Sequence, residues 1–218
     1  MEKIHNNLSI ENLTKTEWFS QFTKYQQREI LNGIKENVDV SLYAKKEFNE
    51  YQMREIRLGL AENLDVSIYA KNEFDVLQMF ILREGLKNNL DVSIYANPSF
   101  NWEQMQQIRN GLEENLNVIP YAKREFSCEQ MREIRNGIFL DLDVSLYAKD
   151  CFNENQMAQI RFGLTDGIDV SSYLNENFSY QQMNQIRLGL TEKKDVSTYA
   201  NVEITWEEMK RIRETTLS

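Results

Sequence analysis

The sequence has few of the residues that many folds and functions require. Its 218 residues include 2 prolines, 8 glycines, 2 cysteines and 1 histidine. So few prolines and glycines argue against an all-β fold with many turns, and they favour helix. The two cysteines, Cys128 and Cys151, suggest a reduced protein rather than a disulfide scaffold, so we expect a cytoplasmic location.

Long apolar runs and positive charge are also scarce. No apolar stretch reaches the roughly 18 residues of a membrane span, so we expect none. Residues 1–10 lack a cationic segment followed by an apolar run, so no signal peptide is expected. Acidic side chains number 34 against 25 basic ones, for a net charge of −9. Phosphate-backbone affinity comes from clustered Lys and Arg, so direct nucleic-acid binding is not expected.

The sequence has few residues or motifs that are typical of catalytic sites. The single histidine, His5, lies near the N-terminus, and a catalytic base needs an oriented partner beside it. The sequence contains no GxSxG motif, Walker loop, GxGxxG motif or metal-spaced Cys/His cluster. We therefore expect no enzyme, no metal site and no cofactor.

The sequence does have a repeat of 26 residues, which runs without an insertion. The acidic or amide position of the repeat is Asp39, Asp65, Asp91, Asn117, Asp143, Asp169 and Asp195. A phenylalanine keeps the same step at Phe22, Phe48, Phe74, Phe100, Phe126, Phe152 and Phe178, and Ile204 closes the series. Methionine does so at Met53, Met79, Met105, Met131, Met157, Met183 and Met209.

Each repeat predicts two helices, as the copy over 49–71 shows. Asn49 is an N-cap candidate with Gln52 at the capping-box position, and a Ser, Thr, Asn or Asp begins the other seven copies. Asn63 stands where a left-handed residue ends a helix. Asp65 then caps a short second helix that we expect from Val66 to about Lys71.

Short turns between these helices allow only near neighbours to pack together. We therefore expect an all-α fold, an α-solenoid of about eight 26-residue helix–turn–helix repeats with degenerate terminal caps. The chain forms a single domain in this interpretation, with an N-terminal cap over 1–22, repeats over 23–204 and a C-terminal cap helix over 205–218. Leu31 replaces the repeat's arginine in the first copy, and Thr215 replaces its glycine in the last.

A glycine recurs inside the first helix of each repeat, where it costs roughly 1 kcal/mol relative to alanine. The series is Gly33, Gly59, Gly85, Gly111, Gly137, Gly163 and Gly189. Repetition of that cost implies a geometric need, and close approach of another helix is the simplest one.

An arginine series is the most specific polar feature. It comprises Arg57, Arg83, Arg109, Arg135, Arg161, Arg187 and Arg213, each four residues after the methionine and beside the apolar stripe. One interpretation is a structural ladder, in which each guanidinium pairs with a cap aspartate or a helix-terminal carbonyl of an adjacent repeat. The alternative is a row of anion-binding forks formed by Arg57, Arg83, Arg109, Arg135, Arg161 and Arg187. We favour the ladder, because packing produces such equal recurrence.

Positions that vary between repeats are where binding specificity can reside. The candidate partner-binding residues are Phe80, Ile81, Trp102, Phe139, Leu140, Phe162, Tyr180 and Trp206. Scattered exposed apolar residues need no explanation, but clustered ones suggest a partner surface. Phe139, Leu140 and Phe162 come from neighbouring repeats, so we expect them to form one patch.

The pattern D-V-S-x-Y-A, then F, then Q-M-x-x-I-R-x-G-L resembles a known type of repeat. Residues 65–70 and 52–60 carry the match, which covers nearly the whole chain. It is similar to an uncharacterised tandem helical repeat of proteins from low-GC Gram-positive bacteria, their phages and other mobile elements. The resemblance implies no activity, but it favours a phage or plasmid setting.

Three functions follow as hypotheses. The first is a non-catalytic protein-binding repeat protein, in its concrete form a mobile-element inhibitor of a host defence protein (anti-CRISPR-like). Its acidic extended surface would bind a basic nucleic-acid-binding host protein. The second is a small-anion or nucleotide sponge that uses the repeated arginines, and the third is an architectural or self-associating solenoid, with homo-oligomers left open. None of the three involves a membrane.

Overall fold

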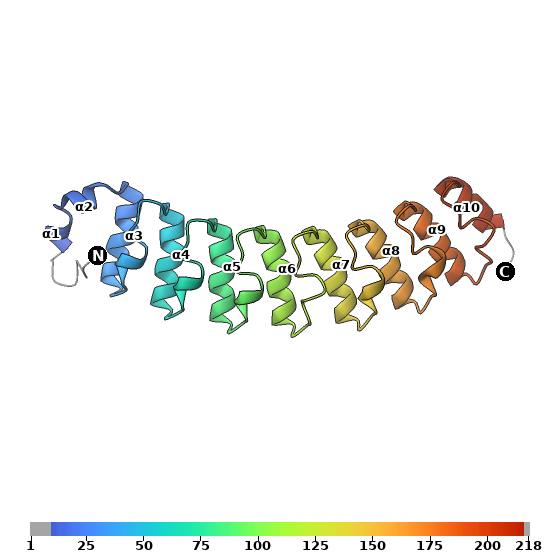
Figure 1. Cartoon of the computed structure of the whole chain (residues 1–218), viewed down its shortest axis with the longest axis horizontal. Helices are drawn as coiled ribbons and strands as arrows, with labels where there is room; N and C mark the ends of the chain where they lie inside the picture. Colours follow the sequence, from blue (N-terminus) through green and yellow to red (C-terminus); the bar gives the residue numbers. More distant parts are fainter. Residues whose placement is uncertain (1–9, 216–218) are drawn as a thin grey trace. The chain divides into compact units, whose positions relative to one another are not determined.

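The computed structural model describes residues 10–215, and in that range the chain is all-α, with ten α-helices and no strand (Figure 1). The helices are α1 (Ile10–Leu13), α2 (Glu17–Ser20), α3 (Lys24–Lys35), α4 (Glu50–Ala61), α5 (Val76–Lys87), α6 (Trp102–Glu113), α7 (Cys128–Phe139), α8 (Glu154–Thr165), α9 (Tyr180–Thr191) and α10 (Trp206–Thr215). Among these residues, no helix combines the length and the apolar character that crossing a membrane requires.

The chain divides into two units, one ending at Arg109 and the other beginning at Asn110, so the division falls inside α6. In the first unit α3 packs against α4, and α4 packs against α5. In the second unit α7, α8, α9 and α10 pack in chain order, each against the next. Sequence neighbours are therefore also spatial neighbours within each unit, as Figure 1 shows.

The predicted second helix of the repeat is wrong in type and length. In five repeats the segment is a 3₁₀-helix of three residues, and residues 119–121 and 197–199 form turns instead. The 3₁₀-helices are η1 (Val40–Leu42), η2 (Val66–Ile68), η3 (Val92–Ile94), η4 (Val144–Leu146) and η5 (Val170–Ser172). A 3₁₀ turn suffices because its role is to aim the following tyrosine back at the preceding helix.

That tyrosine explains the recurrent glycine. A Cβ atom built on Gly59 would lie 1.9 Å from the Tyr69 hydroxyl oxygen, and the other six repeats show 1.8–2.0 Å. The Tyr69 side chain is fully buried, and its hydroxyl donates a hydrogen bond to the Glu55 carbonyl oxygen at 3.2 Å. Close approach is thus the reason for the glycine, although the approaching group is a tyrosine rather than a second helix.

Predicted helix ends are confirmed. Asn49 accepts from the Gln52 amide at 2.9 Å while Gln52 Oε1 accepts from the Asn49 amide at 2.9 Å, which is a complete capping box. Asn63 has φ 57°, and the Leu64 amide donates to the Gly59 carbonyl at 2.9 Å, as in a Schellman motif. Asp141 and Lys193 adopt the same left-handed conformation, although lysine does not favour it and aspartate adopts it less readily than glycine.

The capping glutamine also joins consecutive repeats. Besides capping its own helix, Gln52 donates from Nε2 to the Phe74 carbonyl oxygen at 2.8 Å. The same bond is made by Gln26, Gln130, Gln156 and Gln182, and in each case the acceptor is the carbonyl oxygen of the residue 22 positions after the glutamine. A glutamate could cap the helix but could not donate this second bond. Glu208 stands at this position in α10, the last helix of the described residues.

Substitution of the buried glycine tests the tyrosine contact. In an open helix, Gly→Ala would stabilise by about 1 kcal/mol. We expect Gly59→Ala instead to lower the free energy of unfolding by about 2 kcal/mol, because its Cβ overlaps the Tyr69 hydroxyl. Urea unfolding followed by circular dichroism measures the change. The double variant Gly59→Ala/Tyr69→Phe should recover part of the loss, and a stabilised Gly59→Ala would contradict the contact.

Exchange of glutamine for glutamate tests the link between repeats. Gln182 Nε2 donates to the carbonyl oxygens of Val202 and Ile204, at 2.9 and 2.7 Å. We expect Gln182→Glu to destabilise by about 1–3 kcal/mol, because a carboxylate cannot donate these bonds. Gln181→Glu is the matched control in the same turn, with the same charge change, and should stay within about 0.5 kcal/mol of the parent. Equal losses in both variants would show that charge alone matters.

Candidate protein-interaction surface

The recurrent arginines lie between consecutive helices. Arg57 on α4 donates from Nε to Glu29 Oε2 at 3.0 Å and from Nη1 to Glu36 Oε2 at 2.6 Å, so it spans two carboxylates of the preceding repeat. Arg83 on α5 does the same with Glu55 and Glu62, each at 2.9 Å. Both arginines are buried. We call this series of contacts the arginine ladder.

The ladder joins adjacent repeats, as expected, but its predicted partners are wrong. For Arg57 and Arg83 the carboxylates come from the middle of the preceding helix and from the glutamate at its C-cap, not from the aspartates that cap the 3₁₀-helices. Those aspartates are already engaged, since Asp65 accepts from the Ser67 amide at 3.1 Å and from the Ser67 hydroxyl at 2.6 Å. Hydrogen bonds from Ser67 lower the pKa of the Asp65 carboxyl.

Electrostatics favour the charged state of the ladder. Burial by itself would lower the pKa of the Arg57 guanidinium, but the hydrogen bonds to Glu36 and Glu29 outweigh it and raise that pKa. Arg83 behaves in the same way with Glu55 and Glu62. Burial is also the main cause that raises the pKa of the Tyr69 hydroxyl beside them. Arg57 and Arg83 therefore stay charged, and the Tyr69 hydroxyl stays neutral, over the physiological range.

In the second unit the ladder's partners vary. Arg135 Nη1 lies 3.6 Å from Glu114, and Arg213 pairs with Glu192. Arg187 donates to Gln159 from Nε and to Asp166 from Nη1, each at 3.2 Å. For Arg109, in the first unit, the two positions that supply carboxylates to Arg57 and Arg83 hold Ile81 and Asn88.

Arg161 departs from this pattern in a specific way. Its Nε donates to Glu133 Oε2 at 2.9 Å, but the position of the second acid is taken by Leu140. Its guanidinium carbon lies 4.6 Å from the centre of the Phe162 ring, and the guanidinium carbon of Arg187 lies 5.6 Å from the same centre. Phe162 thus contacts two cations.

The candidate patch at α7 and α8 is exposed, as expected. Phe139, Leu140 and Phe162 are 66%, 44% and 40% exposed; the first two lie at the C-terminal end of α7, the third lies on α8, and these two helices pack against each other. We call these three residues the α7–α8 cluster. The first-turn residues Trp102, Tyr180 and Trp206 are also exposed, on three different helices.

The prediction that Ile81 lies on the surface is wrong. Ile81 is only 2% exposed, whereas its neighbour Phe80 is exposed as predicted. Ile81 occupies the same position in the repeat as the buried Glu29, Glu55 and Glu133, so it faces inward between helices.

Sequence reasoning missed a second group of exposed apolar side chains in the first unit. Tyr25, Tyr51 and Leu77 occupy one position of the repeat on α3, α4 and α5, and all three are exposed. With Phe80 they form what we call the α3–α5 cluster. The signal for the first three was their common 26-residue spacing, which continues as Glu103 and Glu129.

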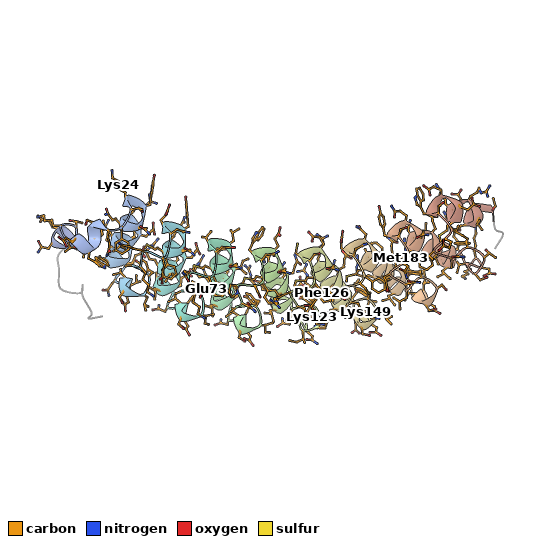
Figure 2. The ribbon with its side chains drawn as sticks, turned by 45° about the horizontal axis from the view of Figure 1, so that its top comes forward. Lys24, Glu73, Lys123, Phe126, Lys149 and Met183 are labelled. Atoms are coloured by element: carbon orange, nitrogen blue, oxygen red, sulfur yellow. The ribbon has the colours of Figure 1, made fainter. Side chains whose placement is uncertain are left out.

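Basic residues accompany the α3–α5 cluster. Arg28 lies 5.9 Å from the centre of the Tyr25 ring, and Arg54 is exposed one turn after Tyr51. Lys24 projects from the first turn of α3 (Figure 2). Basic side chains therefore stand beside Tyr25 and Tyr51, together with the acidic Glu50 at the start of α4 and Asp75 at the N-cap of α5.

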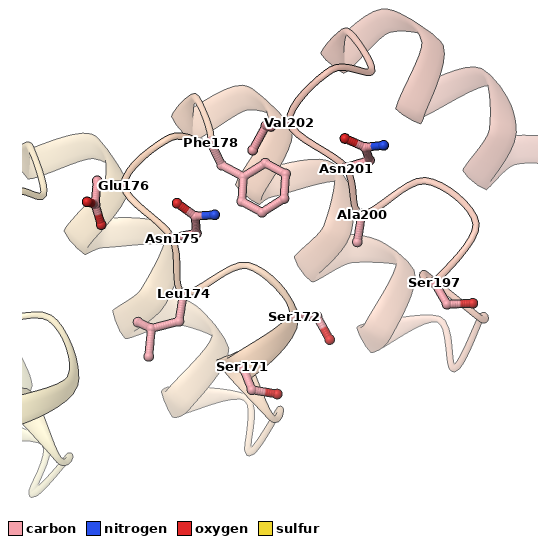
Figure 3. A pocket seen from close by; sticks show the side chains of 10 residues that line it. All are labelled: Ser171, Ser172, Leu174, Asn175, Glu176, Phe178, Ser197, Ala200, Asn201 and Val202. Atoms are coloured by element: carbon pink, nitrogen blue, oxygen red, sulfur yellow. The ribbon is translucent and has the colours of Figure 1, made fainter.

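One groove of the second unit has few groups suited to catalysis. An open groove in the second unit runs along Ser171, Ser172, Leu174 and Asn175 on one repeat and Ser197, Ala200, Asn201 and Val202 on the next (Figure 3). Glu176 is the one ionisable residue among its lining residues, so no acid–base pair faces the groove. Over residues 10–215 there is no group of three or more His, Cys, Asp or Glu side chains able to hold a metal ion. His5 lies outside the described residues.

Comparison with known proteins finds no match among protein-family models, curated proteins or solved structures. The resemblance to a mobile-element repeat therefore stays a prediction.

Removal of one ladder arginine distinguishes the two interpretations of the series. We expect Arg83→Ala to lower the free energy of unfolding by about 3 kcal/mol, because it leaves the buried Glu55 carboxylate unpaired. Arg54→Ala, the same change on an exposed side chain, should stay within about 0.5 kcal/mol. Urea unfolding measures both changes. Unchanged stability of Arg83→Ala, together with loss of phosphate binding, would favour anion-binding forks.

Proposed function

We propose that this chain is a non-catalytic protein-binding protein whose 26-residue repeats stack as an α-solenoid of about eight units. Recurrence of the contacts supports the stacking. The glutamine bond spans 22 residues in both units, as for Gln52 with Phe74 and Gln156 with Phe178. The ladder bond spans 28 residues in both, as for Arg83 with Glu55 and Arg161 with Glu133.

One observation carries the binding function. Polar residues that recur in the repeat are engaged internally: the glutamine links repeats, the arginine bridges helices and the tyrosine hydroxyl lies against the glycine. Many of the residues that vary face outward, and these include large apolar side chains in the α3–α5 and α7–α8 clusters. Exposed apolar groups beside arginine are typical of protein interfaces.

The narrower form of the proposal is an inhibitor of a host defence protein, of the anti-CRISPR kind, encoded by a phage or other mobile element. Its support is the family resemblance together with the net charge of −9. The exposed aspartates Asp39, Asp65 and Asp91 in the first unit and Asp143, Asp169 and Asp195 in the second provide acidic positions for a basic partner.

The small-anion alternative has weaker support. Arg57 and Arg83 are buried and already hold two carboxylates each, so a free anion would have to displace Glu36 or Glu62. Such displacement loses a charge-assisted hydrogen bond for each one gained. Protein binding through the outward residues requires no such exchange.

Affinity capture tests the function. We expect the full chain to capture one protein stoichiometrically from a lysate of a low-GC Gram-positive bacterium, as identified by native mass spectrometry. Substitution of either cluster, as Tyr51→Ser/Leu77→Ser or Phe139→Ser/Phe162→Ser, should abolish capture, because each removes exposed apolar anchors. Elution by salt would support the charge-driven inhibitor.

Ile119→Ser is the matched control, since Ile119 is 63% exposed but lies in a turn rather than on a helix. It should retain capture. Capture that survives both cluster substitutions would contradict the proposed surface. Added masses of a few hundred daltons in multiples would indicate small-anion sites instead. A parent dimer that the cluster variants convert to a monomer, seen by light scattering, would indicate self-association.

A further inference from the structure

Leu140 of the α7–α8 cluster can be compared with the residues at the same position in the other copies of the repeat. At the position of Leu140 the other copies hold Glu36, Glu62, Asn88, Glu114, Asp166 and Glu192. The acids at this position pair with the arginine that follows 21 residues later, as in Glu36 with Arg57, Glu62 with Arg83 and Asp166 with Arg187. A leucine therefore stands where a ladder carboxylate is expected.

Arg161, 21 residues after Leu140, is the arginine that this leucine leaves without a second carboxylate. Within residues 10–215, Arg161 keeps a single carboxylate partner, Glu133, which its Nε contacts at 2.9 Å. Its Nη groups, the ones that hold the second acid elsewhere in the ladder, make no hydrogen bond in that range. The guanidinium carbon lies over the Phe162 ring at 4.6 Å from its centre, and an aromatic ring does not take up the hydrogen-bonding capacity of the Nη groups, so the guanidinium edge that carries them can receive an acceptor.

The surroundings of this edge are apolar. Phe139 ends α7, Leu140 is the C-cap residue of that helix, and Phe162 follows Arg161 on α8, which packs against α7; all three apolar residues are exposed. Such an arrangement, an arginine fork within an apolar rim, is typical of the energetically dominant centre of a protein interface. Since desolvation strengthens a charge-assisted hydrogen bond, the rim would increase the affinity for a carboxylate that enters it.

Nearby charges restrict the partner further. Asp141 directly follows Leu140, Asp143 lies two residues further on, both are exposed, and Asp166 pairs with the neighbouring Arg187. This acidic environment repels a polyanion such as nucleic acid but tolerates one carboxylate placed on the guanidinium edge.

We propose that the α7–α8 cluster and Arg161 form a docking site for an acidic, apolar segment of a partner protein. A Glu or Asp side chain of the segment occupies the missing ladder position on Arg161. Its neighbouring Leu or aromatic side chains pack on Phe139, Leu140 and Phe162. This inference rests on the proposed protein-binding function and names the chemistry of one of its surfaces.

A displayed library of random dodecapeptides, selected on the full chain, tests the site. We expect the enriched peptides to share a Glu or Asp flanked by Leu, Phe or Trp. Synthesis of one such peptide with Gln or Asn in place of the acid should weaken its binding about tenfold or more, as measured by fluorescence polarisation. Enrichment of peptides without a shared acid, or no enrichment, would overturn the inference.

The decisive variant is Leu140→Glu, which restores the ladder carboxylate. It should raise the midpoint of urea unfolding, because Arg161 regains an internal partner, and it should weaken peptide binding at least about tenfold. Replacement of the peptide's acid should then have no additional effect, since both changes remove the same contact. Retained binding by Leu140→Glu would overturn the site.

Leu77→Glu is the matched control, with the same substitution at 46% exposure in the first unit. It should leave peptide binding unchanged. Loss of binding in Leu77→Glu but not in Leu140→Glu would assign binding to the α3–α5 cluster, so the proposed function would stand while this inference failed. Tighter binding of an oligothymidylate than of the peptide, lost in Leu140→Glu, would replace the protein segment by a phosphate ligand.

Discussion

A tyrosine hydroxyl lying on bare helix backbone is the contact on which each repeat depends. Tyr69 is fully buried, and its hydroxyl reaches the Glu55 carbonyl only because Gly59 has no side chain. The 3₁₀ turn aims the tyrosine, and Asp65 fixes the start of that turn through Ser67. A mid-helix glycine is unfavourable for an isolated helix, so the repeat becomes stable only as a complete unit.

Contacts between repeats are made by polar side-chain groups that bind outside their own helix, such as Gln52 Nε2 and Arg83 Nε. Gln52 caps its own helix with its oxygen and binds the next repeat with its nitrogen, so one amide couples helix formation to stacking. Arg83 couples the helices in the other direction, toward the preceding repeat. Two departures match these directions: Leu31 on α3 stands at the arginine position, and Glu208 on α10 stands at the glutamine position.

Sequence reasoning predicted what one helix determines by itself. The cap at Asn49, the left-handed Asn63 and the buried Met53 follow from local hydrogen bonding and from the helical period. The partners of Arg57 did not follow, because they depend on the offset between two helices, which no single-helix pattern contains. The burial of Ile81 was missed for the same reason. Tyr25 and Tyr51 were predictable from their spacing, but their row ends within the first unit and resembles ordinary surface variation.

In a repeated sequence, a residue that lowers stability can be recognised by comparison with the same position in the other copies. At most surface positions no reference state exists, so an exposed leucine carries no argument. At position 140 the other copies supply the reference, an acid at five positions and an asparagine at one. Leucine there leaves the Nη groups of Arg161 without the internal acid that Arg57 and Arg83 have, and it adds apolar surface beside Phe139. Both changes disfavour the free protein and favour a bound one, since departures from a locally consistent pattern are expected where function opposes stability.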